Sequence, residues 1–231
     1  MPAARRLEYD PHRRAIFKKR ERGVEGDARM AVSLVLDTSG SMGDIWNYYQ
    51  SKAIVARVSY LLTRELEKLG HACEVKIFAD RVEQVKNYDQ KGDWSSTKFD
   101  SAGGGTSAGS IAIKEAVKSL NQKAIAENIR TKVVIVLGDG GWDASDKDRI
   151  PEAVKLCKKS RVVSVFVQYF SGVGSSYWHT KMAETAKTEG WDIHEPISTS
   201  NLSERLLPTL KRIIVTLERQ IIRNIRLWEG R

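Results

Sequence analysis

Two adjoining segments stand out in the chain: the mostly apolar Ala31-Val32-Ser33-Leu34-Val35-Leu36 and the polar Asp37-Thr38-Ser39-Gly40-Ser41-Met42. The first segment is typical of a short strand buried on both faces in a parallel sheet. The second places one carboxylate and several hydroxyls in a turn directly after that strand. The sequence therefore predicts a buried strand that presents oxygen-bearing side chains where it ends.

Strand-length apolar segments alternate with helix-length segments along most of the remaining chain. Strands are predicted at 31–36, 73–79, 82–85, 132–137, 161–169 and 191–194. Helices are predicted at 44–69, 107–120, 122–129, 148–160, 176–189 and 202–228. This order indicates βαβ units. We therefore predict an α/β fold of the Rossmann-like, doubly wound type. Its sheet is mostly parallel with one antiparallel edge strand, formed by a turn at Asp80-Arg81, and helices cover both faces.

The net charge of +9 is concentrated at the two ends of the chain. Residues 1–30 hold nine Lys and Arg against five Asp and Glu, and residues 203–231 hold seven against three. We predict a basic N-terminal arm at 1–28, an α/β domain at 29–202 and a C-terminal amphipathic helix at 203–231. The basic ends either contact nucleic acid or an acidic protein surface, or are simply solvated.

The C-terminal helix is predicted to be roughly twice the ~11–12 residues of an average helix. Its apolar residues recur at steps of three and four at Leu207, Leu210, Ile214, Leu217 and Ile221, and Trp228 continues the pattern after Asn224. Its far half either projects to meet a partner helix or folds back on the sheet of its own domain. Pro208 is expected either to start the main helix or to kink it.

The sequence predicts neither a membrane span nor a secretory signal. No apolar run approaches the ~20 residues that cross a bilayer, and residues 1–29 are charged rather than apolar. The expected location is the cytoplasm, or a particle assembled inside the cell. Cys73 and Cys157 lack metal-ligand spacing and are expected to be buried, reduced thiols.

Two further loops combine glycines with oxygen-bearing side chains: Gly103-Gly104-Gly105-Thr106-Ser107 and Gly138-Asp139-Gly140-Gly141. In open α/β sheets, ligands bind beyond the carboxyl ends of the strands, so we expect the three loops to meet at one edge. Glycine lets such loops turn tightly and approach a ligand closely. The candidate ligands are Asp37, Ser39, Ser41, Thr106 and Asp139.

This set of carboxylates and hydroxyls suits a hard divalent cation, Mg²⁺ or Mn²⁺. Mg²⁺ takes six oxygens at ~2.0–2.1 Å and usually keeps several waters. The candidate side chains cannot fill and neutralise every position around the ion. An Asp or Glu of a partner protein is the natural occupant of the position that stays open.

The pattern Asp37-x-Ser39-Gly40-Ser41, followed by Thr106 and then Asp139, resembles the metal ion-dependent adhesion site of von Willebrand factor A domains. The resemblance covers residues of about 30 to 220. It implies that Asp37, Ser39 and Ser41 ligate the metal directly or through water. It also implies that Thr106 is a switchable hydroxyl ligand and Asp139 the second carboxylate.

One departure from that pattern concerns the residue before the last Asp-Gly. The family usually has Thr or Ser there, whereas this chain has Gly138. A missing hydroxyl at that position removes a group that would help to hold the ligands in place but leaves the ligand set intact. The alternative reading is that Asp37 and Ser39 form only a turn and capping signal, because Asp and Ser favour helix caps.

Aromatic residues cluster near the same loops. We predict a partner-binding rim made of Trp46, Trp94, Trp142 and Trp178, since aromatic side chains dominate interface energetics. Core packing is the alternative for these residues.

Enzyme classes fit the sequence poorly, and no catalytic residue is predicted. A dinucleotide-binding domain would place G-x-G-x-x-G after the first strand, where this chain has acid instead. A Ser-His-Asp hydrolase would need a G-x-S-x-G elbow between strand and helix, which Ser107 does not provide.

The resemblance implies three intracellular roles. In the first, the chain acts beside an AAA+ ATPase, as in chelatase and MoxR-like complexes. In the second, it is a scaffold component of a phage or another large particle. In the third, it associates with nucleic acid through its basic ends, and salt-sensitive binding lost without residues 1–28 would indicate that role.

Overall fold

A computed structural model describes residues 29–43, 50–90, 94, 99, 101–170 and 184–229. Within these ranges the chain forms a six-stranded sheet in the order β3-β2-β1-β4-β5-β6. The strands are β1 (Met30–Asp37), β2 (Ala72–Phe78), β3 (Val82–Lys86), β4 (Thr131–Gly138), β5 (Val162–Phe170) and β6 (Ile193–Ser198). Every neighbouring pair is parallel except β2 and β3, which are antiparallel at one edge. The predicted sheet is confirmed.

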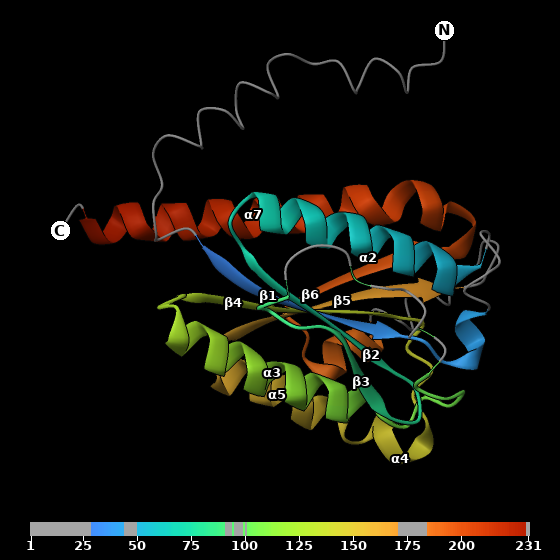
Figure 1. The fold of residues 1–231 in the computed structure, drawn as a ribbon. Coiled ribbons are helices and arrows are strands. Elements are labelled where there is room, and N and C mark those ends of the chain that lie inside the picture. Colours follow the sequence, from blue (N-terminus) through green and yellow to red (C-terminus); the bar gives the residue numbers. More distant parts are fainter. Residues whose placement is uncertain are drawn as a thin grey trace, which may run out of the picture.

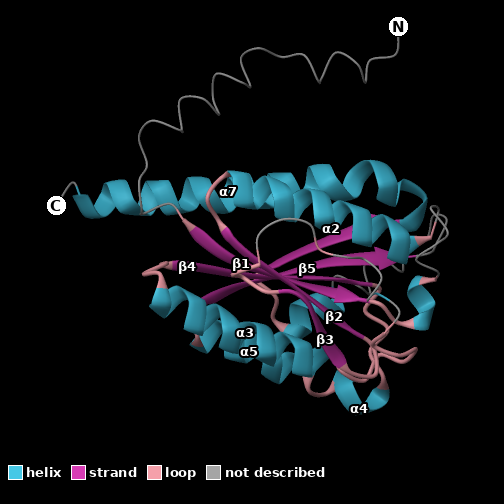
Figure 2. Cartoon of the chain, in the orientation of Figure 1, coloured by secondary structure: helices cyan, strands magenta, loops and turns pink. Residues whose placement is uncertain are grey.

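Helices cover both faces of this sheet (Figures 1 and 2). Helices α2 (Ser51–Lys68) and α7 (Leu202–Glu229) pack on one face, and α3 (Gly109–Ala126) and α5 (Ile150–Lys159) pack on the other. The short helix α4 (Ala144–Lys147) follows β4, in a segment predicted to be a loop. The doubly wound α/β fold is therefore confirmed.

Successive side chains of the central strands enter opposite layers of the core, as the two-residue period of a strand requires. On β1 the layer under α2 and α7 receives Met30, Val32, Leu34 and Leu36. The layer under α3 and α5 receives Ala31 and Val35. All six are fully buried, which explains why this strand is a nearly continuous apolar run.

Two predicted element boundaries were wrong. Residues 107–129 were predicted as two helices, but α3 is one continuous helix, and Asn121 lies inside it with its Oδ1 accepting a hydrogen bond from Lys132 Nζ at 2.6 Å. The last strand was predicted at 191–194, but β6 continues through Pro196 to Ser198. An edge strand tolerates proline because one side of its backbone has no neighbouring strand.

Helix α7 runs back across the sheet from the carboxyl edge. Its buried face extends to Leu217 and Glu218, and the end of the helix continues beyond the sheet edge at which β1 begins (Figure 1). Glu218 Oε1 accepts a hydrogen bond from His71 Nε2 at 3.1 Å, which ties this turn of α7 to the start of β2. Pro208 lies inside the helix rather than at its start.

Several predictions fall outside the described residues, among them the N-terminal arm at 1–28, Trp46 and Trp178. Of the helix predicted at 176–189, residues 184–189 are described and are helical. Cys73 and Cys157 are free and buried, as expected. No helix in the described part of the chain is both long and apolar enough to cross a membrane.

Candidate metal centre

The three loops predicted from the sequence lie at the carboxyl edge of the sheet. Asp37 is the last residue of β1 and Gly138 the last of β4, and these two strands are parallel neighbours. Thr106 lies just before α3. The parallel pairing therefore places Asp37 beside the loop that carries Asp139.

Asp37 and Ser39 are the most deeply buried of the predicted ligands, each with 1% of its surface exposed. Asp37 is the carboxylate of the pair. Its Oδ1 accepts a hydrogen bond from Ser39 N at 2.9 Å. Its Oδ2 is buried and has no hydrogen-bond partner among the described residues. A buried carboxylate oxygen without a partner is costly, so this atom marks a place where a positive ligand would be stabilising.

Burial, and to a lesser extent repulsion by the Asp139 carboxylate, raise the pKa of the Asp37 carboxyl to about 7. The hydrogen bonds from Ser39 and the Lys52 ammonium act in the opposite direction. A divalent cation relieves both causes of the raised pKa, because it compensates the buried negative charge of Asp37. The electrostatics of the site thus fit a cation.

Ser39 and Ser41 bring their hydroxyls together. Their Oγ atoms lie 3.0 Å apart. Two adjacent ligands of an octahedral ion with bonds of ~2.0–2.1 Å lie about 2.9 Å apart. The spacing of the two serine hydroxyls therefore fits neighbouring positions around Mg²⁺.

The first and second loops are joined by their backbones, since Gly40 N donates a hydrogen bond to Gly104 O at 2.8 Å. The second loop is in turn held by Asp80, whose carboxylate accepts from Gly104 N at 2.9 Å and Gly105 N at 3.0 Å. Asp80 was recognised in the sequence only as a turn residue. Its position at the end of the neighbouring strand was the available signal.

The second and third loops meet at Thr106, whose Oγ1 donates a hydrogen bond to Gly141 O at 2.7 Å. In the third loop, Asp139 Oδ1 accepts from Gly141 N at 2.8 Å, and Asp139 O accepts from Gln168 Nε2 at 3.0 Å. Gln168 on β5 was missed because one glutamine in a strand carries no sequence signal. The loops thus form one connected cluster that contains all five predicted side chains.

The role of these five residues as metal ligands remains a prediction. No group of three or more His, Cys, Asp and Glu side chains that could hold a metal occurs in the described ranges. The predicted set has only two carboxylates and relies on hydroxyls for its other ligands, so it is not a cluster of that kind.

The two described tryptophans of the predicted rim lie partly or wholly inside the molecule. Trp94 is 5% exposed and packs in the core against Phe99 and Tyr60, with ring centroids 5.8 and 5.7 Å away. Trp142 is half-buried between Phe78 and Phe166, each 5.8 Å away. Core packing accounts for Trp94, and Trp142 packs against the core layer under α3 and α5.

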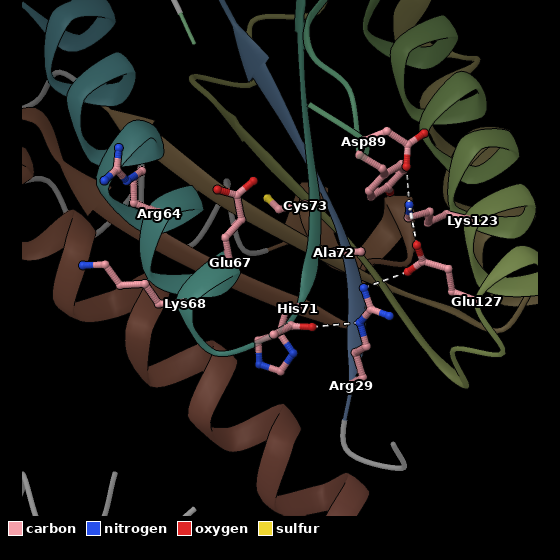
Figure 3. Close-up of a pocket in the computed structure, with 12 residues that line it drawn as sticks. Arg29, Arg64, Glu67, Lys68, His71, Ala72, Cys73, Asp89, Lys123 and Glu127 are labelled. Atoms are coloured by element: carbon pink, nitrogen blue, oxygen red, sulfur yellow. Dashed lines mark hydrogen bonds and ion pairs between the residues drawn. The ribbon is translucent and has the colours of Figure 1, made fainter. Parts of the chain in front are cut away.

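A cavity of about 680 Å³ lies away from these loops, near the starts of β1 and β2 (Figure 3). The carboxylates on its wall are paired with cations, Glu67 with Lys86 at 2.8 Å. Arg29 pairs with Glu127 at 2.7 Å, and Lys123 pairs with both Asp89 and Glu127 at 2.6 and 2.7 Å. Because its carboxylates are already paired with cations, this cavity offers no comparable metal chemistry.

Comparisons of this chain with known proteins give a family match that agrees with the α/β fold described above. The sequence model of the von Willebrand factor type A domain matches residues 32–202. No curated protein sequence matches the chain.

Two solved structures have similar folds. A mutant of the PilB minor pilin from Streptococcus sanguinis aligns with a TM-score of 0.57 at 13% identity, over 86% of this chain and 63% of the pilin. An aerotolerance-related membrane protein from Bacteroides fragilis aligns with a TM-score of 0.53 at 14% identity, over 83% of this chain and 99% of that protein. The chain thus spans less than two thirds of the pilin, and at such identities the likeness concerns the fold alone.

Proposed function

This chain belongs to the von Willebrand factor type A domain family, and we propose that it uses Mg²⁺ or Mn²⁺ to bind an acidic group of a partner protein. Domains of this family are generally non-catalytic modules of protein–protein interaction. The proposed ligands are Asp37, Ser39, Ser41, Thr106 and Asp139.

The observation that carries the proposal is the buried carboxylate of Asp37. Its Oδ2 is buried without a hydrogen-bond partner among the described residues, and burial together with repulsion by the nearby Asp139 carboxylate raises its pKa. A fold retains such a group at a cost to stability unless a bound cation compensates it.

The number of the ligands indicates what a partner would contribute. The two carboxylates and three hydroxyls of the proposed set number five, whereas the ion takes six oxygens. When bound, the ion supplies a Lewis-acidic centre with at least one of its six positions left over. A carboxylate oxygen from an Asp or Glu of the partner suits that position.

The test uses Mn²⁺-loaded protein, because water bound to Mn²⁺ speeds the relaxation of bulk water protons. Glutarate is the probe, and glutaramide is a control of the same length without charge. We expect glutarate to displace metal-bound water and lower the relaxation enhancement, and glutaramide to leave it unchanged. Equal responses to both probes, or no response to glutarate, would reject binding of an acidic group.

The larger setting of the chain stays a prediction from its sequence. This applies to a complex with an AAA+ ATPase, to a scaffold role in a particle, to nucleic-acid contact through the basic ends and to a cytoplasmic location.

A further inference from the structure

Asp143 makes an unusual pair of contacts across the candidate metal centre. Its Oδ2 accepts a hydrogen bond from Thr106 N at 3.3 Å, and its Oδ1 lies 3.1 Å from Thr106 Oγ1. Both carboxylate oxygens of Asp143 therefore face one residue of the second loop, which is 37 positions away in the sequence.

The position of Asp143 at the start of a helix makes its contact with Thr106 unexpected. Asp143 is the N-cap residue of α4, yet its side chain makes no capping hydrogen bond. An N-cap aspartate normally accepts a hydrogen bond from an amide of the helix that it begins. Here the carboxylate is turned toward Thr106 instead.

The contact also bears on the direction of the Thr106 hydroxyl proton. Thr106 is 6% exposed, and its hydroxyl has one proton with two acceptors close by, Gly141 O at 2.7 Å and Asp143 Oδ1 at 3.1 Å. A hydroxyl that donates its proton to the protein keeps its lone pairs for a cation. An ionised acceptor strengthens such a hydrogen bond and makes the hydroxyl oxygen a better ligand.

We propose that Asp143 is a positioning residue for the metal centre: it fixes Thr106 through its amide and hydroxyl and directs the hydroxyl lone pairs to the cation. This inference rests on the proposed function and adds a residue outside the five predicted ligands. Asp143 acts through Thr106 rather than as a ligand, because both of its oxygens already face Thr106.

The central test is a double-mutant cycle read by calorimetric titration of Mg²⁺. Asp143→Asn keeps the shape of the side chain but leaves one acceptor oxygen in place of two. We expect it to weaken Mg²⁺ binding about 10- to 100-fold, the usual effect of removing a partner of a metal ligand. In a Thr106→Val background the same change should alter binding by less than about twofold, because coupled residues are not additive.

Asp148→Asn is the matched control, since it removes an equal charge from an exposed residue at the other end of α4. It should leave Mg²⁺ binding within about twofold of wild type. Thermal unfolding of each metal-free variant, followed by circular dichroism, shows that the folded proteins are being compared.

A second readout requires no metal. Hydrogen exchange of the Thr106 amide in chelated protein should be faster in Asp143→Asn and Asp143→Ala than in wild type, and unchanged in Asp148→Asn. Unchanged exchange of the Thr106 amide in both Asp143 variants would contradict the proposal that Asp143 fixes Thr106.

The outcomes separate the two claims. If wild type binds Mg²⁺ but Asp143→Asn binds it equally well, or if its effect persists in Thr106→Val, this inference alone is overturned. If wild type binds neither Mg²⁺ nor Mn²⁺, the proposed function is overturned and this inference with it.

Discussion

The Asp37 carboxylate lies directly against Gly138: a Cβ atom placed on Gly138 would come within 2.9 Å of both Asp37 Oδ2 and Asp37 Cβ. The departure from the usual Thr or Ser at this position is therefore linked to the position of Asp37. With glycine at 138, the carboxylate fills the space that a side chain would occupy.

Gly138→Ala is expected to displace Asp37 and to weaken Mg²⁺ binding by about tenfold or more. Overpacking of this kind typically lowers the free energy of unfolding by ~1–3 kcal/mol. Gly104→Ala is the matched control, because a Cβ there would meet nothing within 4 Å. Calorimetric titration and urea unfolding of both variants check the prediction, and equal behaviour of the two would contradict it.

Asp37→Asn is expected to stabilise the metal-free protein at pH 8. The folded-state pKa of Asp37, about 7, lies above its ordinary value of 3.8. The folded state therefore binds this proton more tightly than the unfolded state. The resulting stability is present below pH 4 and is lost as the pH rises to about 7. At 1.36 kcal/mol per pKa unit the loss is at most about 4 kcal/mol.

This prediction is checked by urea unfolding in chelator at pH 5 and pH 8. The drop in the free energy of unfolding between the two should be smaller in Asp37→Asn than in wild type. Asp148→Asn, a charge-matched change at an exposed site, should retain the wild-type drop. The same pH dependence in all three proteins would count against a raised pKa at Asp37.

Metal affinity should also depend on pH, because the cation and the proton compete for Asp37. With a pKa of about 7, the ionised fraction of this carboxyl falls about tenfold between pH 8 and pH 6. We expect the Mn²⁺ dissociation constant to rise by about the same factor, and it can be followed by electron paramagnetic resonance of free Mn²⁺. A constant affinity from pH 6 to pH 8 would be inconsistent with Asp37 as a ligand of this pKa.

Glu218→Ala should destabilise the packing of α7 around residue 218. Because Met30 N donates to His71 Nδ1 at 3.2 Å, His71 Nε2 is the donor to Glu218 Oε1. Removing the Glu218 carboxylate leaves the buried His71 Nε2–H without its acceptor, which lowers the free energy of unfolding by ~1–3 kcal/mol. Urea unfolding and hydrogen exchange of the α7 amides should report this, whereas the exposed change Lys211→Ala should have little effect. Equal exchange in both variants would contradict a stabilising role for the hydrogen bond between His71 and Glu218.

Much of the fold could be predicted because burial on both faces leaves a strong pattern. The strand predicted at 132–137 matches β4 to within one residue at each end, since Val133 to Leu137 are all buried. The errors occurred where tertiary contacts override local preference. Asn121 is a poor helix former, but Lys132 stabilises it inside α3. Pro196 argues against a strand unless the strand is known to lie at an edge.

The candidate site could be predicted only as three separate loops. Each loop follows a strand or precedes a helix, and that position is visible in the sequence. The contacts between loops are not visible, because nothing in the spacing of Thr106 and Asp143 indicates that they touch. The same holds for Trp94, whose neighbours Tyr60 and Phe99 become evident only in the folded chain.

Titration of Mg²⁺ and Mn²⁺ into chelated protein tests the central claim most directly, read by calorimetry and by the midpoint of thermal unfolding. The proteins to compare are wild type, Asp37→Ala, Asp139→Ala and the control Asp148→Asn. We predict saturable binding and thermal stabilisation in wild type and Asp148→Asn, and neither in the two site variants. Absence of a metal-dependent shift in wild type, or the same shift in Asp37→Ala and Asp139→Ala, would contradict a metal centre built from these loops.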